Sequence, residues 1–406
     1  MKKLSAILCL LIAALPGTPA EAPQKPFDDI GAITRDLSAI TGLKVLKPVP
    51  YDTLSREGLK EYIQKKIKAE VKPEEIRAEE LALKKFGFVP QDFDLERTTV
   101  DLLTEQAAAF YDYRKKRLYV IDSNSDAMQE MALVHELAHA LADQHFRLGR
   151  FIKKSESGDD RAMAHLAVME GQATWLTFEF FSKRMGRSLK DNPDLARRMA
   201  GSMQSTDGQY PVLDKAPLYM RETLLFPYTQ GMLFQNRLVE KMGTAGFSEV
   251  FRRPPLSTQQ ILHPEKYFRR VEPSSPKPPA FPESRGWRKL IEGSFGELEH
   301  ALLLRQYGGK EAEALAAKWK GSSFLIVEKK DSAGSMLAYV SDWEDRDAAR
   351  QFFREYRVVL KGKWKKFEVE SESENKLAGR GDDGRFQVTL EGARVSSLEG
   401  LPNGKP

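Results

Sequence analysis

The order of apolar and polar positions predicts a mainly helical first two thirds of the chain. Thr53 or Ser55 is placed to cap the first long helix. Pro73 and the acids after it suit the first turn of the second, and Gly87 and Pro90 end it. The predicted helices are residues 56–69, 73–86, 95–110, 126–146, 159–185 and 226–242.

Between two of these helices, residues 109–122 read as a β-hairpin with a basic turn. The second strand of this hairpin covers residues 117–121 and comes directly before the helix at 126–146. We expect it to be an edge strand beside that helix. The alternative is an ordinary hairpin of the core.

A proline-rich segment at 271–284 predicts a semi-rigid linker and a domain boundary. The pattern changes after it, to short strands mixed with helices. We predict helices at 288–306, 310–320 and 342–358, and strands at 323–329, 335–341, 366–370, 385–390 and 393–397. The predicted class is therefore α+β: a mainly helical domain at 21–270 with a small edge hairpin, then a small α+β domain at 285–406 with helices on one face of a sheet.

The N-terminus has the pattern of a secretory signal peptide. Lys2 and Lys3 precede an apolar run at 4–15, and small residues before Ala20 form a cleavage site, which gives a signal peptide at 1–20. Cleavage after Ala22 and an uncleaved anchor are the alternatives. We expect an exported protein, periplasmic or secreted, without a stable membrane anchor after cleavage.

Composition narrows the chemistry. Cys9 is the one cysteine and lies in the apolar run, so the mature chain has no thiolate for catalysis or metal binding. Metal chemistry would then use His and carboxylates. The net charge of +5 comes from interspersed charges of both signs, which argues against a nucleic-acid partner.

The strongest chemical signal is His-Glu-Leu-Ala-His at residues 135–139. Positions four apart share one helix face, so His135 and His139 can bind one metal ion. Glu136 is turned by about 100° from His135, where a general base for an activated water belongs. The motif predicts one Zn²⁺ per chain.

A catalytic zinc usually has three protein ligands, and three residues compete for the last place. His145 would complete the pattern His-Glu-x-x-His-x-x-Gly-x-x-His of the metzincins, but Ala142 stands at its glycine. With Ala142 the helix should continue and carry His145 away from the metal. Glu170 on the next long helix is the favoured ligand, and His165 is the third candidate.

Residues 169–175, Met-Glu-Gly-Gln-Ala-Thr-Trp, are similar to the glutamate-ligand motif Asn-Glu-Gly-Phe-Ala of aminopeptidase-type gluzincins. The resemblance implies that Glu170 is the third ligand and that Gly171 and Ala173 allow close helix packing around zinc. No segment like Gly-x-Met-Glu-Asn, which binds a free amino terminus in aminopeptidases, is present. This departure favours an endopeptidase.

The wider pattern also resembles a group of uncharacterised bacterial exported proteins. The matching pieces lie within residues 95–270 and are 105–112, 133–146, 167–173, 226–231 and 254–267. This resemblance supports the zinc helix and implies no substrate.

The predicted function is zinc-dependent hydrolysis of peptide bonds in extracytoplasmic proteins or peptides, with Glu136 as general base. Tyr228 and His263, each next to a proline, are candidates for stabilising the oxyanion. Asp143 could accept the second N–H of His139, and Thr174 could hydrogen-bond at Glu170. The alternative is a catalytically inactive zincin-like protein that binds peptide or cell-envelope partners.

Overall fold

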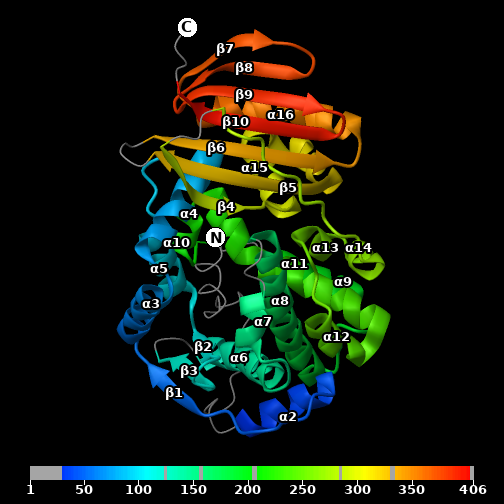
Figure 1. Cartoon of the computed structure of the whole chain (residues 1–406). Coiled ribbons are helices and arrows are strands. Elements are labelled where there is room, and N and C mark those ends of the chain that lie inside the picture. The colour runs from blue at the N-terminus through cyan, green and yellow to red at the C-terminus, as the bar shows by residue number, and fades with distance from the viewer. Residues whose placement is uncertain are drawn as a thin grey trace.

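The computed structural model describes residues 30–122, 126–154, 159–203, 208–282, 286–329 and 334–402. The predicted signal peptide lies outside these ranges. Within them, a helical region and a large antiparallel sheet stack end to end, which confirms the α+β class (Figure 1). No helix of the described ranges has both the length and the hydropathy for a membrane crossing.

The first helices are α2 (Ile30–Thr41), α3 (Arg56–Glu70), α4 (Pro73–Phe86) and α5 (Leu95–Gln106). The Ser55 hydroxyl caps α3 by accepting a hydrogen bond from the Gly58 N–H at 3.1 Å. Gly87 ends α4 in the left-handed conformation, with φ of 80°. The bounds of α3 and α4 confirm the helices predicted at 56–69 and 73–86. The prediction of a helix at 95–110 was wrong beyond Gln106, because Ala109 and Phe110 pair in a sheet.

That sheet has three strands, in the order β1 (Tyr51–Leu54), β3 (Arg117–Ile121) and β2 (Ala109–Asp112). β2 and β3 are antiparallel, so the predicted hairpin is confirmed. The expectation that β3 is the edge strand was wrong, because β1 pairs with it in parallel on its other side. The edge strand of the hairpin is β2.

The central helices include α6 (Asp126–Phe146) and α8 (Asp159–Arg184), as predicted. α11 (Leu218–Met242) begins eight residues before the predicted start at 226 and carries Pro227 inside it. Proline usually interrupts a helix, but α11 continues through Pro227 and is buried along much of its length. Shorter elements complete the region: α7 (Leu148–Lys154), α9 (Pro193–Ser202), α10 (Pro211–Lys215), η3 (Gly243–Ala245), α12 (Gly246–Arg252), α13 (Thr258–Leu262) and α14 (Pro264–Arg269).

α8 and α11 touch backbone to backbone. A Cβ atom added to Gly171 would lie 2.1 Å from the Gly231 carbonyl carbon, and one added to Gly231 would lie 2.2 Å from the Ala167 oxygen. Only glycine fits at such a crossing. The close packing expected at Gly171 is therefore present, and it fixes α8 one residue after Glu170.

The C-terminal sheet has seven antiparallel strands in the order β4-β5-β6-β10-β9-β8-β7. α15 (Glu297–Glu313), η4 (Ala314–Lys318) and α16 (Arg346–Lys363) lie behind it (Figure 1). The strands are β4 (Trp287–Gly293), β5 (Trp319–Lys329), β6 (Ser335–Trp343), β7 (Phe367–Glu372), β8 (Lys376–Gly381), β9 (Gly384–Glu391) and β10 (Arg394–Leu401).

Two predictions for this region were wrong. The segment 288–306 was predicted as one helix, but its first part is β4, where Ile291 pairs with Ile326 of β5. The segment 310–320 was also predicted helical, and its end opens β5 at Trp319. In both places pairing with strands distant in sequence outweighs local helix propensity. β8 was not predicted at all.

Aromatic packing joins the two regions. Phe86, at the end of α4, packs edge to face on Phe295, Phe324 and Tyr339, with ring centroids 4.6–5.5 Å apart. The Tyr307 hydroxyl of α15 donates a hydrogen bond to the Gly87 carbonyl at 2.6 Å. The buried hydrophobic side chains of both regions form one continuous core.

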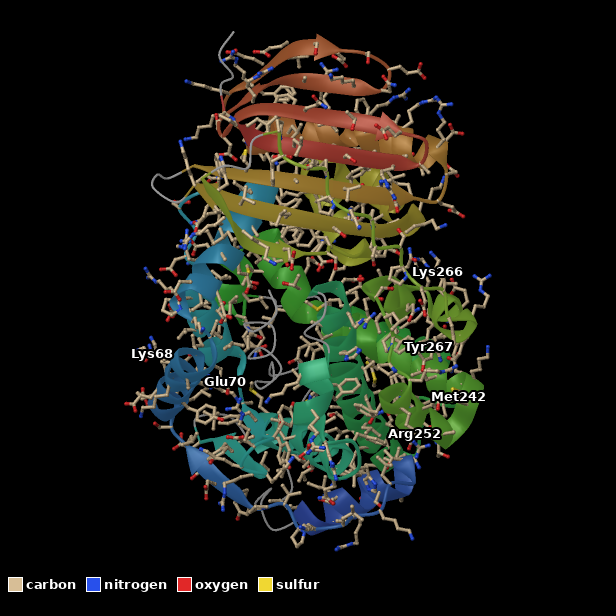
Figure 2. The ribbon with its side chains drawn as sticks, in the orientation of Figure 1. Lys68, Glu70, Met242, Arg252, Lys266 and Tyr267 are labelled. Carbon is tan, nitrogen blue, oxygen red and sulfur yellow. The ribbon has the colours of Figure 1, made fainter. Side chains whose placement is uncertain are left out.

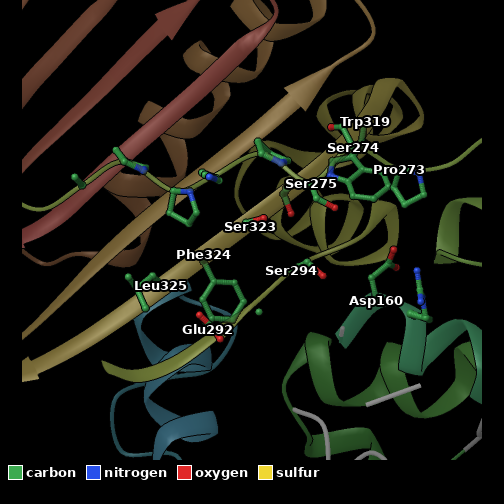
Figure 3. Close-up of a pocket in the computed structure, with 18 of the residues that line it drawn as sticks. Asp160, Pro273, Ser274, Ser275, Glu292, Ser294, Trp319, Ser323, Phe324 and Leu325 are labelled. Carbon is green, nitrogen blue, oxygen red and sulfur yellow. The ribbon is translucent and has the colours of Figure 1, made fainter. Parts of the chain in front are cut away.

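The proline-rich segment lies along β5. The Ser274 N–H donates to the Lys320 carbonyl at 2.7 Å, and its hydroxyl donates to Asp342 at 2.7 Å. The segment borders a pocket of about 640 Å³, with Phe324 on one side and Asp160 of α8 on the other (Figure 3). The division into separate domains at this segment stays a prediction.

His300 lies at the centre of the sheet-and-helix core. Its Nδ1–H donates to the Gly296 carbonyl and its Nε2 accepts from the Tyr339 hydroxyl, both at 2.6 Å. This pattern requires the neutral imidazole. Burial lowers the pKa of His300 from 6.5 to about 4, although the Gly296 carbonyl opposes the shift.

We predict that His300 makes the fold acid-sensitive between pH 6.5 and 4. The unfolded chain binds a proton there and the folded chain does not, so stability is complete above pH 6.5 and falls as the pH decreases. At pH 5 the loss from this group is about 2 kcal/mol. Urea unfolding of His300→Asn should show a shallower fall in stability between pH 7 and 5. Parallel curves for the two proteins would contradict the prediction.

We also predict that Gly171→Ala destabilises the protein by about 1–3 kcal/mol, because the added methyl group meets backbone that cannot move aside. The matched control is Gly201→Ala in α9, where a Cβ atom meets nothing within 4 Å. That control should be neutral or raise the free energy of unfolding by up to ~1 kcal/mol. Equal effects of the two substitutions in thermal unfolding would refute the packing argument.

Candidate metal centre

Two helices bring the three predicted ligands together. His135 and His139 are one turn apart on α6, and Glu170 faces them from α8. The two Nε2 atoms are 3.1 Å apart. Glu170 Oε2 lies 3.1 Å from His135 Nε2 and 3.2 Å from His139 Nε2. The three atoms thus form a nearly equilateral triangle.

The triangle has the dimensions of a metal site. Ligand atoms at zinc distances of about 2.1 Å in a tetrahedron lie roughly 3.4 Å apart. All three side chains are buried, with 0–3% exposure. Two imidazole nitrogens and a carboxylate oxygen that converge away from water repel one another unless a cation or protons lie between them. The donor set of this site therefore fits zinc.

The electrostatics of the cluster follow from burial and mutual contact. Burial would raise the pKa of Glu170, but the His139 charge and hydrogen bonds from both imidazoles outweigh it and lower the pKa to about 2. Burial lowers the pKa of His135 to about 4. An ionised Glu170 beside a neutral His135 is the state in which both offer lone pairs to a cation.

Glu136 lies beside this triangle and is also buried. Its carboxylate comes within 4.8 Å of ligand atoms of both imidazoles. Burial raises the pKa of Glu136 to about 8. The backbone N–H of Tyr111, in β2, donates a hydrogen bond to the carboxylate and opposes that shift.

The register of the hairpin explains why the Tyr111 N–H is available. Tyr111 pairs with Leu118, and the Leu118 N–H donates to the Pro50 carbonyl next to β1 rather than to β2. The 111–118 pair is therefore not hydrogen-bonded, and the Tyr111 N–H points away from the sheet. Sequence reasoning missed this backbone group. The strand pattern at 109–112 was visible, but the register that aims the N–H at Glu136 was not.

The other two candidate ligands lie elsewhere. α6 continues to Phe146, as the alanine at 142 predicted, and the His145 Nε2–H donates a hydrogen bond to the Lys44 carbonyl at 2.8 Å. His165 stacks on Phe151, with ring centroids 4.6 Å apart. Neither residue joins the triangle.

Tyr228 lies next to the cluster and His263 is held elsewhere. The Tyr228 ring is 6.1 Å from the His135 ring, centroid to centroid, and is buried. His263 Nε2 is 2.7 Å from Glu297 at the start of α15, and its Nδ1 is 3.8 Å from Glu265. In the described contacts of His263 no residue of the triangle occurs, so Tyr228 is the better placed of the two.

Asp143 does not serve as the partner that we expected for His139. It accepts hydrogen bonds from the Tyr111 hydroxyl at 3.0 Å, from Lys116 Nζ at 2.5 Å and from the Leu148 N–H at 2.8 Å. This expectation was wrong because Asp143 ties α6 to the hairpin and to the next helix. Its negative charge still raises the pKa of His139, after the larger effects of burial, which lowers it, and of Glu170 and Glu136, which raise it. Thr174 is buried, and its hydroxyl has no hydrogen-bond partner among the described residues.

The family that matches part of this chain does not include the candidate metal centre. Residues 240–405 match a family described as a domain of unknown function (DUF8575). The match includes α12 to α14 and the seven-stranded sheet, and it begins after both α6 and α8. No curated protein and no solved structure matches the chain.

Proposed function

We propose that this chain is a zinc-dependent peptidase whose ligands are His135, His139 and Glu170. The observation that carries the proposal is the triangle of three buried donor atoms with 3.1–3.2 Å edges. Two imidazoles and one carboxylate leave a fourth tetrahedral position for water or substrate, as in catalytic rather than structural zinc sites. When bound, zinc supplies a Lewis acid that polarises a carbonyl and lowers the pKa of water.

Glu136 moves the proton in this proposal. Its carboxylate takes a proton from the attacking water and later delivers it to the leaving amine. The Tyr111 N–H orients the carboxylate by its hydrogen bond. Both groups come from rigid elements, a helix and a paired strand, so their relative position is fixed before substrate binds.

β2 supports a peptide as the substrate class. β2 is the outer strand of its sheet, on the side of α6, and the backbone groups of Ala109 and Tyr111 point away from β3. Glu136 takes the Tyr111 N–H, so the other outward groups of β2 are the ones a peptide would use. An extended peptide can add to such an edge through main-chain hydrogen bonds. Main-chain recognition along the middle of a peptide fits endopeptidase cleavage. With the expected signal peptide, the substrates would be extracytoplasmic proteins or peptides.

Tyr228 is the proposed donor to the oxyanion. It is carried by α11, which the glycine contact holds against α8, and its ring flanks His135. A phenol at this place can donate a hydrogen bond to the negative oxygen that develops as water attacks.

We predict different outcomes for the two glutamates. Glu170→Ala should lose most of its zinc, measured by elemental analysis of reloaded protein, because one of three ligands is gone. Glu136→Gln should keep one zinc per chain and lose activity on fluorescein-labelled casein by a factor of roughly 10²–10⁴, because an amide cannot take the proton.

Full zinc in Glu170→Ala would remove Glu170 from the ligand set. No zinc in reloaded wild-type protein would refute the peptidase. A zinc-loaded wild type without activity on casein or on a library of quenched peptides would favour the catalytically inactive zincin-like protein.

A third variant tests the oxyanion donor. Tyr228→Phe should keep its zinc and lower kcat by a factor of about 10²–10³, with a smaller effect on KM, because the hydrogen bond forms only in the transition state. Tyr219→Phe, on the same helix but packed against Phe88, is the matched control and should keep its kcat. An unchanged kcat in Tyr228→Phe would show that another group stabilises the oxyanion.

A further inference from the structure

Besides the pocket at the proline-rich segment, the protein has a cavity that lies outside the candidate metal centre. It has a volume of about 650 Å³, within the range of small-molecule sites. Its walls come from the end of α6, from α7, from the start of α8 and from α12 with the residues that follow it. None of the three proposed ligands, nor Glu136, lines this cavity.

Four arginines surround the cavity: Arg147, Arg150, Arg161 and Arg252, the last labelled in Figure 2. Among the described residues that line it, none is acidic. Arg147, Arg150 and Arg252 have no ion pair with any acid of the described ranges. Guanidinium groups gathered in this way repel one another, and a bound anion would remove that repulsion.

Three acids of the described ranges that lie near these arginines in sequence are engaged elsewhere. Asp143 pairs with Lys116 at 2.5 Å, and Glu249 pairs with Arg253 at 2.8 Å. Asp160 accepts hydrogen bonds from the Thr258 N–H and hydroxyl at 2.9 and 2.6 Å. These three acids therefore do not balance the charges of Arg147, Arg150 and Arg252.

His165 gives an independent sign of a ligand. Its side chain lines the cavity, only 4% of the residue is exposed, and within the described ranges neither ring nitrogen makes a hydrogen bond of ordinary geometry, although the Phe151 backbone lies close enough to act on the ring. A buried polar group left unpaired costs about 1–3 kcal/mol. Burial lowers its pKa to about 4, against the opposing effect of the Phe151 backbone, so the ring is neutral and offers one N–H donor.

The floor of the cavity is aromatic. Phe146 and Phe251 stack with ring centroids 4.6 Å apart, and Phe151 meets Phe251 edge to face at 5.2 Å. The His165 ring stacks on Phe151 at 4.6 Å. Such a floor suits a flat apolar body rather than a bare inorganic ion.

We propose that this cavity binds an organic phosphate, with the phosphate among the arginines and His165 and a flat apolar body on the phenylalanines. A phosphate carries up to two charges and three free acceptor oxygens, and so uses several guanidinium forks, whereas one carboxylate is satisfied by a single arginine. The proposal does not depend on the proposed peptidase activity, because the two sites share no residue.

Phenyl phosphate is the probe, titrated calorimetrically into the full-length zinc-loaded protein. We expect binding of phenyl phosphate, much weaker binding of benzoate and none of phenol.

Arg150→Gln and Arg252→Gln change exposed side chains and should each weaken binding by about tenfold. The matched control is Arg354→Gln, on the exposed surface of α16, and it should bind as the wild type does. Glu170→Ala should also bind normally, which separates this site from a phosphate bound at zinc.

His165→Phe keeps the stacked ring and removes both nitrogens. Without ligand it should unfold at a higher temperature than the wild type, because an unpaired buried group is gone. It should also lose most of the thermal stabilisation by phenyl phosphate. Lower stability of this variant together with normal binding would show a structural role for His165 and overturn the assignment.

The source of the phosphate is separated by a second titration, with vesicles of phosphatidylglycerol. Vesicle binding that weakens in Arg150→Gln and Arg252→Gln would identify a lipid headgroup, and binding of phenyl phosphate alone would identify a soluble ligand. Absence of both, or equal loss in Arg354→Gln, would overturn the proposal.

Discussion

The position of a single buried carboxylate, that of Glu170, defines the candidate metal centre. Glu170 of α8 meets both imidazoles of α6, at 3.1 and 3.2 Å. Its charge is stable away from water only because cationic or hydrogen-bonding partners surround it. Since α6 and α8 must stay in register for this contact, everything that fixes α8 also fixes the centre.

Two contacts supply that support from different directions. The Gly171–Gly231 crossing holds α8 against α11 at backbone distance and places Tyr228 beside His135. Asp143 links α6 to the hairpin through Tyr111 and Lys116, and this holds β2 beside Glu136. The hairpin, Glu136 and the three residues of the triangle are thus tied together by buried contacts rather than by loops.

The same two helices also border the arginine-lined cavity, at its α6 and α8 walls. His165 and Glu170 are five residues apart on α8, which is about 140° around the helix. α8 therefore presents Glu170 to the candidate metal centre and His165 to the arginine-lined cavity. The seven-stranded sheet lies against this helical region through Phe86 and its aromatic neighbours, and contributes no residue to the triangle.

The sequence by itself determined the helix at 126–146, the imidazole pair four residues apart on it and the direction of His145 away from that pair, because these depend on helix periodicity within one element. The choice of Glu170 came from the resemblance of residues 169–175 to a known motif. It failed at β4, at the end of α5 and at the place of β3 in its sheet, because strand pairing joins residues far apart in the chain. Only the tertiary structure decided that Tyr111 faces Glu136, that Asp143 binds the hairpin and that four arginines meet around His165. Those contacts depend on register and on how helices pack, and neither leaves a local pattern in the chain.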